Sequence, residues 1–177
     1  MRLGDYYRGL PLTLRSPLAP DEVARRIGGA VASPMNPFAT GIVGYAPFGR
    51  VQLRRRKSLF SYNGMPVLVG PVKAEGRGSL LLLKYRGHLA IRLAFPLAFL
   101  LVGLGVLVFV ATGPSPGVAP WQLTPILAAL VVFMTLPLAI HRFMIRNAEA
   151  DLAQLAAFLR TTLDAKDVPA PEGWTGG

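Results

Sequence analysis

Four consecutive cations, Arg54 to Lys57, form the densest concentration of charge in the sequence. A run of this kind binds the phosphates of nucleic acid, the headgroups of an anionic membrane or an acidic protein, or it is the solvated end of a strand. Nucleic-acid binding normally comes with a recognition helix, a zinc finger or stacking aromatic residues. Beside the run the sequence offers only Phe60 and Tyr62. Docking on an acidic surface and a solvated strand end are therefore the two favoured interpretations.

Residue types that do catalysis or hold metals are scarce. His88 and His141 have no third ligand near them in the sequence, which disfavours a metal or haem site. Cysteine is absent, which excludes disulfides and thiolate ligands. No Ser–His–Asp arrangement and no phosphate-binding loop is visible. The sequence therefore predicts a non-catalytic protein without a cofactor or a metal ion.

The charge is distributed unevenly along the chain. Residues 1–92 hold 15 cations and 4 anions, and residues 141–177 hold 4 cations and 5 anions. Residues 93–140 contain no charged residue at all. The surface of a globular domain needs polar coverage, so an uncharged stretch of this length is unusual in such a domain. These three segments are the predicted domains: a basic α+β domain, an apolar hairpin, and a C-terminal helix with a tail.

Two apolar stretches lie in the middle segment, at about 93–112 and 121–140. The loop between them, 113–120, is rich in proline and glycine. About 20 apolar residues in a helix span the roughly 30 Å hydrocarbon layer of a bilayer. The hydropathy pattern therefore predicts a two-helix transmembrane hairpin, and the chain is expected to be an α+β membrane protein.

The residues that flank the hairpin indicate its orientation. Arg92 precedes the first stretch, Arg142 and Arg146 follow the second, and the connecting loop carries no charge. Trp121 is placed where an interfacial aromatic residue is expected. The positive-inside rule then predicts a two-pass protein of the bacterial inner membrane, with both termini in the cytoplasm.

The N-terminal segment reads as a small antiparallel sheet with one helix. Residues 10–16 alternate leucines with other residues, as in a half-buried strand. Pro20 followed by Asp21 and Glu22 is typical of the first turn of a helix. Further strands are predicted at 41–45, 51–55, 65–72 and 79–86. Because of Pro71, the third of these is expected at an edge of the sheet or with a bulge.

An amphipathic helix is predicted at 145–167. Apolar residues three and four positions apart form one stripe, which consists of Ile145, Ala148, Leu152, Leu155, Leu159 and Leu163. Asp151 is expected to lie off this stripe. The stripe is predicted to pack on the sheet or, alternatively, on a partner subunit. The residues after it read as a loose tail.

The order of these elements resembles a reduced START-like (helix-grip) domain. The likeness runs through the opening strand, the helix at "SPLAPDEV", the antiparallel strands and the closing helix, over about 10–92 and 141–166. It implies a cavity beneath the C-terminal helix. Separately, Asn63–Gly64–Met65–Pro66 and Gly70, in a β segment that leads directly into an apolar stretch, are similar to a group of uncharacterised bacterial membrane proteins. That second resemblance implies architecture only.

The predicted function is that of a non-catalytic, membrane-anchored accessory or scaffold subunit of a larger bacterial membrane complex, photosynthetic or respiratory. Its partners would be the lipid bilayer, anionic headgroups and other proteins of the complex. The residues expected to contact a partner or the membrane are Arg54, Arg55, Arg56, Lys57, Arg92, Trp121, Arg142 and Arg146, with the helix stripe.

Two alternative functions stay open. One is a lipid or small-molecule binding module, whose cavity would be lined by Leu81, Leu83, Leu155 and Leu159. The other is a membrane-tethered regulator that binds nucleic acid, which would show a strongly salt-dependent affinity.

Overall fold

The computed structural model describes residues 3–36, 38–57, 66–87, 89–113, 128, 130–132, 135–136, 139, 142, 146–171 and 174. The chain divides into two compact units. One consists of Met1–His88 together with Ile145–Gly177, and the other is Leu89–Met144. The two charge-bearing ends of the chain therefore fold together, apart from the uncharged middle.

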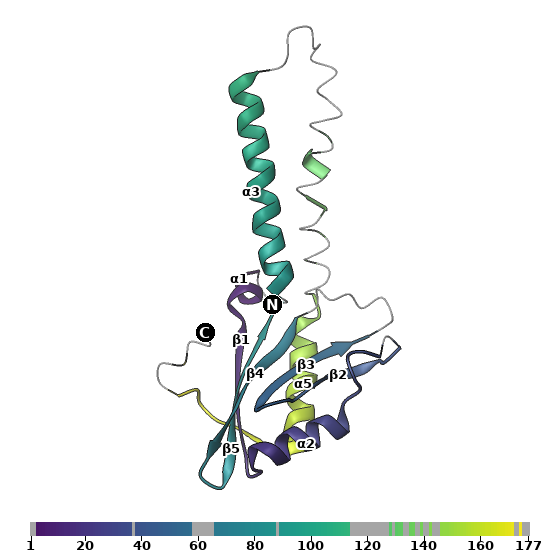
Figure 1. The fold of residues 1–177 in the computed structure, drawn as a ribbon, viewed down its shortest axis with the longest axis vertical. Coiled ribbons are helices and arrows are strands. Elements are labelled where there is room, and N and C mark those ends of the chain that lie inside the picture. The colour runs from purple at the N-terminus through teal and green to yellow at the C-terminus, as the bar shows by residue number, and fades with distance from the viewer. Residues whose placement is uncertain are drawn as a thin grey trace. The chain divides into compact units, whose positions relative to one another are not determined.

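The elements follow one another as helices and strands of ordinary length (Figure 1). The first part contains α1 (Leu3–Arg8), β1 (Leu10–Ser16), α2 (Pro20–Ala30), β2 (Gly41–Tyr45), β3 (Arg50–Arg56), β4 (Val67–Glu75) and β5 (Gly78–Arg86). The second part contains α3 (Leu89–Thr112), α5 (Ala148–Leu163) and β6 (Lys166–Asp167). The strand predicted at 10–16 and the helix that starts at Pro20 are confirmed. The helix α1 and the strand β6 were not predicted.

The strands form an antiparallel sheet in the order β2-β3-β4-β5-β1-β6. The predicted four-strand meander is β2 to β5, each strand paired with the next. β1 lies beside β5, and the short β6 pairs with the other side of β1. β4 therefore occupies the centre of the sheet. Pro71 was predicted to mark an edge strand or a bulge: the edge is wrong, and the pairing of β4 with β5 is interrupted at Gly70 and Pro71.

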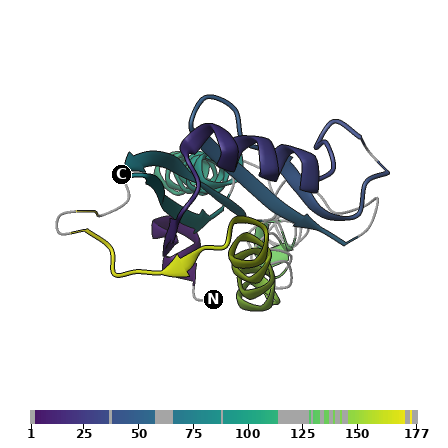
Figure 2. The same ribbon diagram turned by 90° about the horizontal axis from the view of Figure 1, so that it is seen from below.

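The core lies between one face of the sheet and two helices. Strand residues on this face alternate with residues on the other face, and Leu14, Leu81 and Leu83 have no exposed surface. α5 packs here, since Ser16 Oγ donates a 2.7 Å hydrogen bond to the Leu163 carbonyl oxygen. α2 contacts both α5 and the sheet, and Figure 2 shows it lengthwise where α5 is seen end-on. The side of the sheet away from α2 and α5 is here called the helix-free face, since neither of these two helices covers it.

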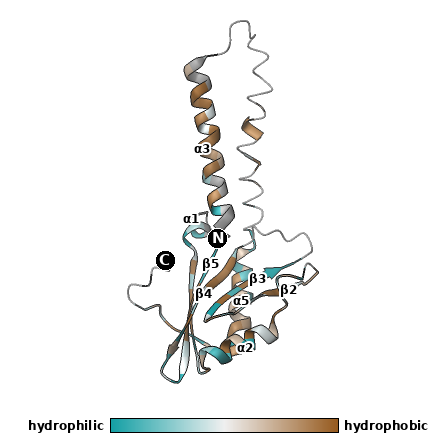
Figure 3. Cartoon of the chain, viewed as in Figure 1, coloured by the Kyte–Doolittle hydropathy of each residue, from teal (hydrophilic) through white to brown (hydrophobic). Residues whose placement is uncertain are grey.

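In the uncharged middle of the chain, the helix predicted at 93–112 is present as part of α3 (Leu89–Thr112), but the predicted membrane crossing is not supported. The structure describes one helix there, α3, with Pro96 inside it, and much of its ribbon has the colour of hydrophobic residues (Figure 3). Apolar side chains such as Leu100 and Leu107 are exposed. Of the second predicted stretch, 121–140, only isolated residues belong to the described part of the chain. Among the residues that the structure describes, no helix has the length and apolarity that a membrane crossing requires.

The predicted transmembrane hairpin is therefore wrong, and so are the classification as a membrane protein and the two-pass inner-membrane localisation that followed from it. The prediction rested on freedom from charge over 93–140, which is an average property of the segment and does not by itself establish a membrane crossing. The charge pattern does identify the middle of the chain as a separate unit.

Candidate functional site

Two of the four cations in the basic run tie β3 to α5. Asp151 Oδ1 accepts a 2.8 Å hydrogen bond from Arg55 Nη1 and lies 3.0 Å from Lys57 Nζ. The Asp151 side chain is only 10% exposed, so the two cations neutralise a carboxylate inside the domain. The prediction that Asp151 lies off the buried side of α5 is wrong. Its carboxylate can be buried because the guanidinium of Arg55, on β3, neutralises its charge.

A third cation of the run, Arg56, holds the loop that joins α2 to β2. Its Nη2 donates to the Pro34 carbonyl oxygen at 3.1 Å, and its Nη1 donates to the carbonyl oxygens of Asn36 and Ala39. Arg56 is only 9% exposed. Planar guanidinium groups are suited to this task because they present several donors in a fixed fork. Arg56 is therefore a structural residue of the loop.

Arg54 lies on the other side of the strand from Arg55. Burial, together with the nearby positive charge of Arg56, lowers the pKa of Arg54 from its ordinary value. The basic run is thus divided: Arg55 and Lys57 face α5, Arg56 holds a loop, and Arg54 belongs to the helix-free face.

Burial also affects Tyr85, which lies on the helix-covered face and is 1% exposed. Burial raises the pKa of the Tyr85 hydroxyl far above its ordinary value, and the negative charge of Asp151 adds to the effect. The folded chain therefore keeps this proton at alkaline pH, where the unfolded chain loses it. The stability that this proton represents is present below about pH 10 and is lost as the pH rises further.

We expect the wild-type chain to lose about 1 kcal/mol more stability between pH 9.5 and 11 than the Tyr85→Phe variant, from the linkage between proton binding and unfolding. Urea unfolding at several pH values measures this difference. The control is Tyr45→Phe, because Tyr45 is exposed and its loss should leave the alkaline effect in place. Equal pH dependence in the wild type and Tyr85→Phe would contradict the assignment.

The remaining residues that were predicted to contact a partner or the membrane lie in different parts of the chain. Arg92 is half-buried in α3, and Arg142 and Arg146 are exposed. On α5, Leu155, Leu159 and Leu163 are fully buried and Leu152 is half-buried, so most of the described stripe packs in cis. Trp121, Ile145, His88 and His141 lie outside the described residues.

The cavity implied by the START-like resemblance was expected beneath the C-terminal helix. Its four predicted lining residues, Leu81, Leu83, Leu155 and Leu159, are all 0% exposed. They belong to the packed core between the sheet and α5. The pocket that the structure contains lies elsewhere, on the helix-free face.

The helix-free face is basic. Val69 pairs with Lys84, Lys73 with Leu80 and Val67 with Arg86, so these cations share one side of the sheet. The pairing of Arg50 with Pro71 adds Arg50, and alternation along β3 adds Arg54. Among the described strand residues, Glu75 is the one acid that the register places on this face. Its carboxylate is bound by Arg15 through two 2.8 Å hydrogen bonds.

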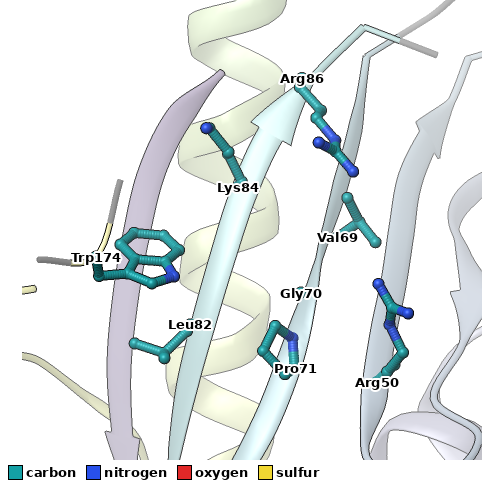
Figure 4. A pocket seen from close by; sticks show the side chains of 8 residues that line it. All are labelled: Arg50, Val69, Gly70, Pro71, Leu82, Lys84, Arg86 and Trp174. Carbon is teal, nitrogen blue, oxygen red and sulfur yellow. The ribbon is translucent and has the colours of Figure 1, made fainter. Parts of the chain in front are cut away.

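A pocket of about 50 Å³ is set into this face (Figure 4). It is lined by Arg50, Val69, Gly70, Pro71, Leu82, Lys84, Arg86 and Trp174. Among the residues that the structure describes, the lining combines three cations with apolar side chains and includes no acid. Figure 4 shows the guanidinium groups of Arg50 and Arg86 on either side of Val69, with the Trp174 indole near Leu82.

The floor of the pocket is a local interruption of the sheet. β4 pairs with β5 at Val69–Lys84 and again at Val72–Leu81. Between these two pairs, Gly70 and Pro71 are not paired with β5. Pro71 has no backbone N–H to donate to the ladder. Gly70 has no side chain, and a Cβ there would overlap the carbonyl oxygen of Leu82. The Gly–Pro pair thus explains a hollow in the middle of a sheet.

Trp174 reaches the pocket because the tail follows the edge of the sheet. After α5 ends, β6 pairs with β1, and the Val168 N–H donates to the Thr13 carbonyl oxygen at 3.2 Å. Arg160 also holds Asp167 through two 3.0 Å hydrogen bonds. Trp174 was not among the predicted site residues, because the tail was expected to be loose. A single tryptophan in a tail of small residues and prolines was the available signal.

Within the described part of the chain, no group of three or more histidine, aspartate and glutamate residues is arranged to hold a metal ion. Comparisons with family models, with curated proteins and with solved structures find no match to this chain. The functional conclusion therefore depends on the site itself.

Proposed function

We propose that this chain is a non-catalytic accessory subunit whose helix-free sheet face docks on an acidic surface of a partner protein. The observation that carries the proposal is the excess of positive charge on that face. Among the described strand residues, Arg50, Arg54, Lys73, Lys84 and Arg86 share it with one acid, Glu75, to which Arg15 is bound.

The distribution of ion pairs supports this choice of surface. Among the described residues, three acids of the domain are paired away from this face: Glu22 with Arg25 and Arg26, Asp151 with Arg55 and Lys57, and Asp167 with Arg160. Glu75, which lies on it, is paired with Arg15. The described strands therefore place more positive than negative charge on the helix-free face. Complementary charge of this kind speeds encounter with an acidic partner and rejects basic ones.

An exposed aromatic residue lies next to this face. Phe48, at the turn between β2 and β3, is fully exposed and precedes Gly49 and Arg50. Both Phe48 and Gly49 have positive φ, 49° and 69°, and the Arg50 N–H donates to the Pro47 carbonyl oxygen. Such a turn favours Asn-Gly, so phenylalanine adopts a strained backbone there. Aromatic and arginine side chains are the residues that contribute most at protein interfaces.

The two alternative functions receive less support. A lipid or small-molecule module needs a pocket of about 300 Å³ or more, whereas this pocket holds about 50 Å³. Binding of single-stranded nucleic acid relies on successive stacking platforms, and Trp174 is the one aromatic residue in the lining. A protein partner requires neither feature.

Charge reversal on the helix-free face tests the proposal. The full-length, affinity-tagged chain is crosslinked in intact cells and its complexes are separated by size. We expect Arg50→Glu/Arg86→Glu to reduce the recovered protein complex at least tenfold, because like charges at an interface cost several kcal/mol. The matched control, Arg25→Glu/Arg77→Glu, makes the same change in net charge on exposed residues of α2 and the β4–β5 turn and should retain the complex.

Equal loss in both double variants would contradict the assignment of this surface. A wild-type chain that forms no complex would contradict the function itself. Disappearance of the complex after nuclease treatment would favour the nucleic-acid alternative instead. Thermal unfolding of each variant establishes that both double variants are folded.

A further inference from the structure

We propose that the pocket of Arg50, Lys84, Arg86 and Trp174 is a subsite for a single carboxylate carried on an apolar stem. This inference rests on the proposed function, since it names the chemical group of the partner that the helix-free face would bind. Two groups of a protein have this chemistry: the C-terminal residue when its side chain is apolar, and a glutamate side chain.

The charge of the pocket favours an anion. Arg50 and Arg86 lie on either side of Val69, and the described residues show neither guanidinium bound to an acid (Figure 4). Neighbouring like charges repel, so an anion between them lowers the energy of the folded chain. A guanidinium presents parallel donors that match the two oxygens of a carboxylate, and such charge-assisted bonds are stronger than neutral ones.

The apolar part of the lining specifies what the carboxylate is attached to. Val69, Pro71, Leu82 and the Trp174 indole form the remainder of the wall around the cations. A free inorganic anion keeps a full hydration shell and gains nothing from such a wall. An anion with methylene or methyl groups behind it buries those groups there, at about 25 cal/mol per Å².

The volume limits how much of a ligand enters. About 50 Å³ is several times the roughly 10–15 Å³ that a cavity needs to hold one water molecule, but it falls far below the volume of an ordinary ligand pocket. A carboxylate and one or two carbon atoms fit this description. The pocket therefore receives the end of a group that extends from a larger partner.

Trp174 provides a direct reporter. The chain contains two tryptophans, Trp121 and Trp174, so Trp121→Phe leaves Trp174 as the only source of indole fluorescence. In that background the full chain is titrated with N-acetylleucine, which models a chain terminus, and with N-acetylglutamate α-amide, which models a side chain. N-acetylleucinamide, which is neutral, and inorganic phosphate are the comparison probes.

We expect one of the two carboxylates to change the Trp174 emission with saturation, and whichever binds more tightly identifies the source of the group. The neutral amide and phosphate should bind at least tenfold more weakly. Arg86→Gln should weaken carboxylate binding about tenfold through the lost charge-assisted bonds, whereas Arg77→Gln on the β4–β5 turn should leave it unchanged. Arg50→Gln repeats the test on the second guanidinium, in case the first variant does not fold.

Three results would overturn the subsite: no response to either carboxylate, equal binding of the amide, or phosphate binding as tight as that of the carboxylates. Each of them leaves the proposed function standing if the charge-reversal experiment succeeds, because docking of the whole face does not require an occupied pocket. Conversely, carboxylate binding together with failed charge reversal would refute the accessory-subunit proposal alone.

Discussion

Replacement of Asp151 with alanine should lower the free energy of unfolding by about 3 kcal/mol. Removing one partner of a buried ion pair costs roughly 3–5 kcal/mol, because the remaining charge is left without compensation. The lower end applies here, since the Arg55 and Lys57 side chains are 30% and 32% exposed and gain water when the carboxylate is lost. Denaturant unfolding of the full chain measures the change.

Two further variants show whether the ion pair is responsible. Glu149→Ala removes the same charge from an exposed position of α5 and should cost less than about 1 kcal/mol. The double variant Asp151→Ala/Arg55→Ala should lose at least 1 kcal/mol less than the sum of its single changes. Strict additivity would mean that Arg55 and Asp151 do not interact, and the explanation given for the basic run would be wrong.

Gly70→Ala should destabilise the chain by about 3 kcal/mol and also deform the pocket. The added Cβ would overlap the Leu82 carbonyl oxygen and approach the Leu83 Cα to 2.9 Å. These are backbone atoms of the neighbouring strand, which cannot move aside as the end of a flexible side chain can, and overpacking of this kind costs 1–3 kcal/mol or more. Unfolding in urea gives the stability, and Trp174 emission reports on the pocket.

The matched control for this change is Gly28→Ala in α2. A Cβ at Gly28 meets nothing within 4 Å. Alanine is the better helix former there, so this variant should be stabilised by about 0.5–1 kcal/mol. If Gly70→Ala proved as harmless as Gly28→Ala, the close approach of β4 and β5 at the pocket floor would not exist.

Local sequence patterns predicted the elements whose signals are contained within a few residues. The alternation of leucines with other residues predicts β1, and Pro20 followed by two acids predicts the start of α2. Both signals are local, because strand faces and helix starts depend on neighbours in the sequence. Pro71 predicted an edge strand or a bulge; β4 lies in the centre of the sheet, and it accommodates the proline by a gap in its pairing with β5.

The candidate site depends on contacts between distant residues, which no local pattern reveals. The burial of Asp151 is explained only by Arg55, which lies 96 residues earlier. The pocket joins the Gly–Pro pair of β4 with a tryptophan from the tail, and its cations come from β3 and β5. The sequence shows a basic N-terminal half and draws attention to the run 54–57, whereas the proposed docking face takes its cations from β3, β4 and β5.

Position-resolved photocrosslinking tests the docking face most directly. Phe48, beside Arg50, and Phe38, in the loop before β2, are both exposed aromatic residues, so a photoreactive phenylalanine replaces either one with little disturbance. We predict a protein adduct from position 48 in cells, at least tenfold more abundant than from position 38, that is lost in the Arg50→Glu/Arg86→Glu background. Equal adducts from both positions, or an adduct from position 48 that survives the charge reversal, would contradict the account.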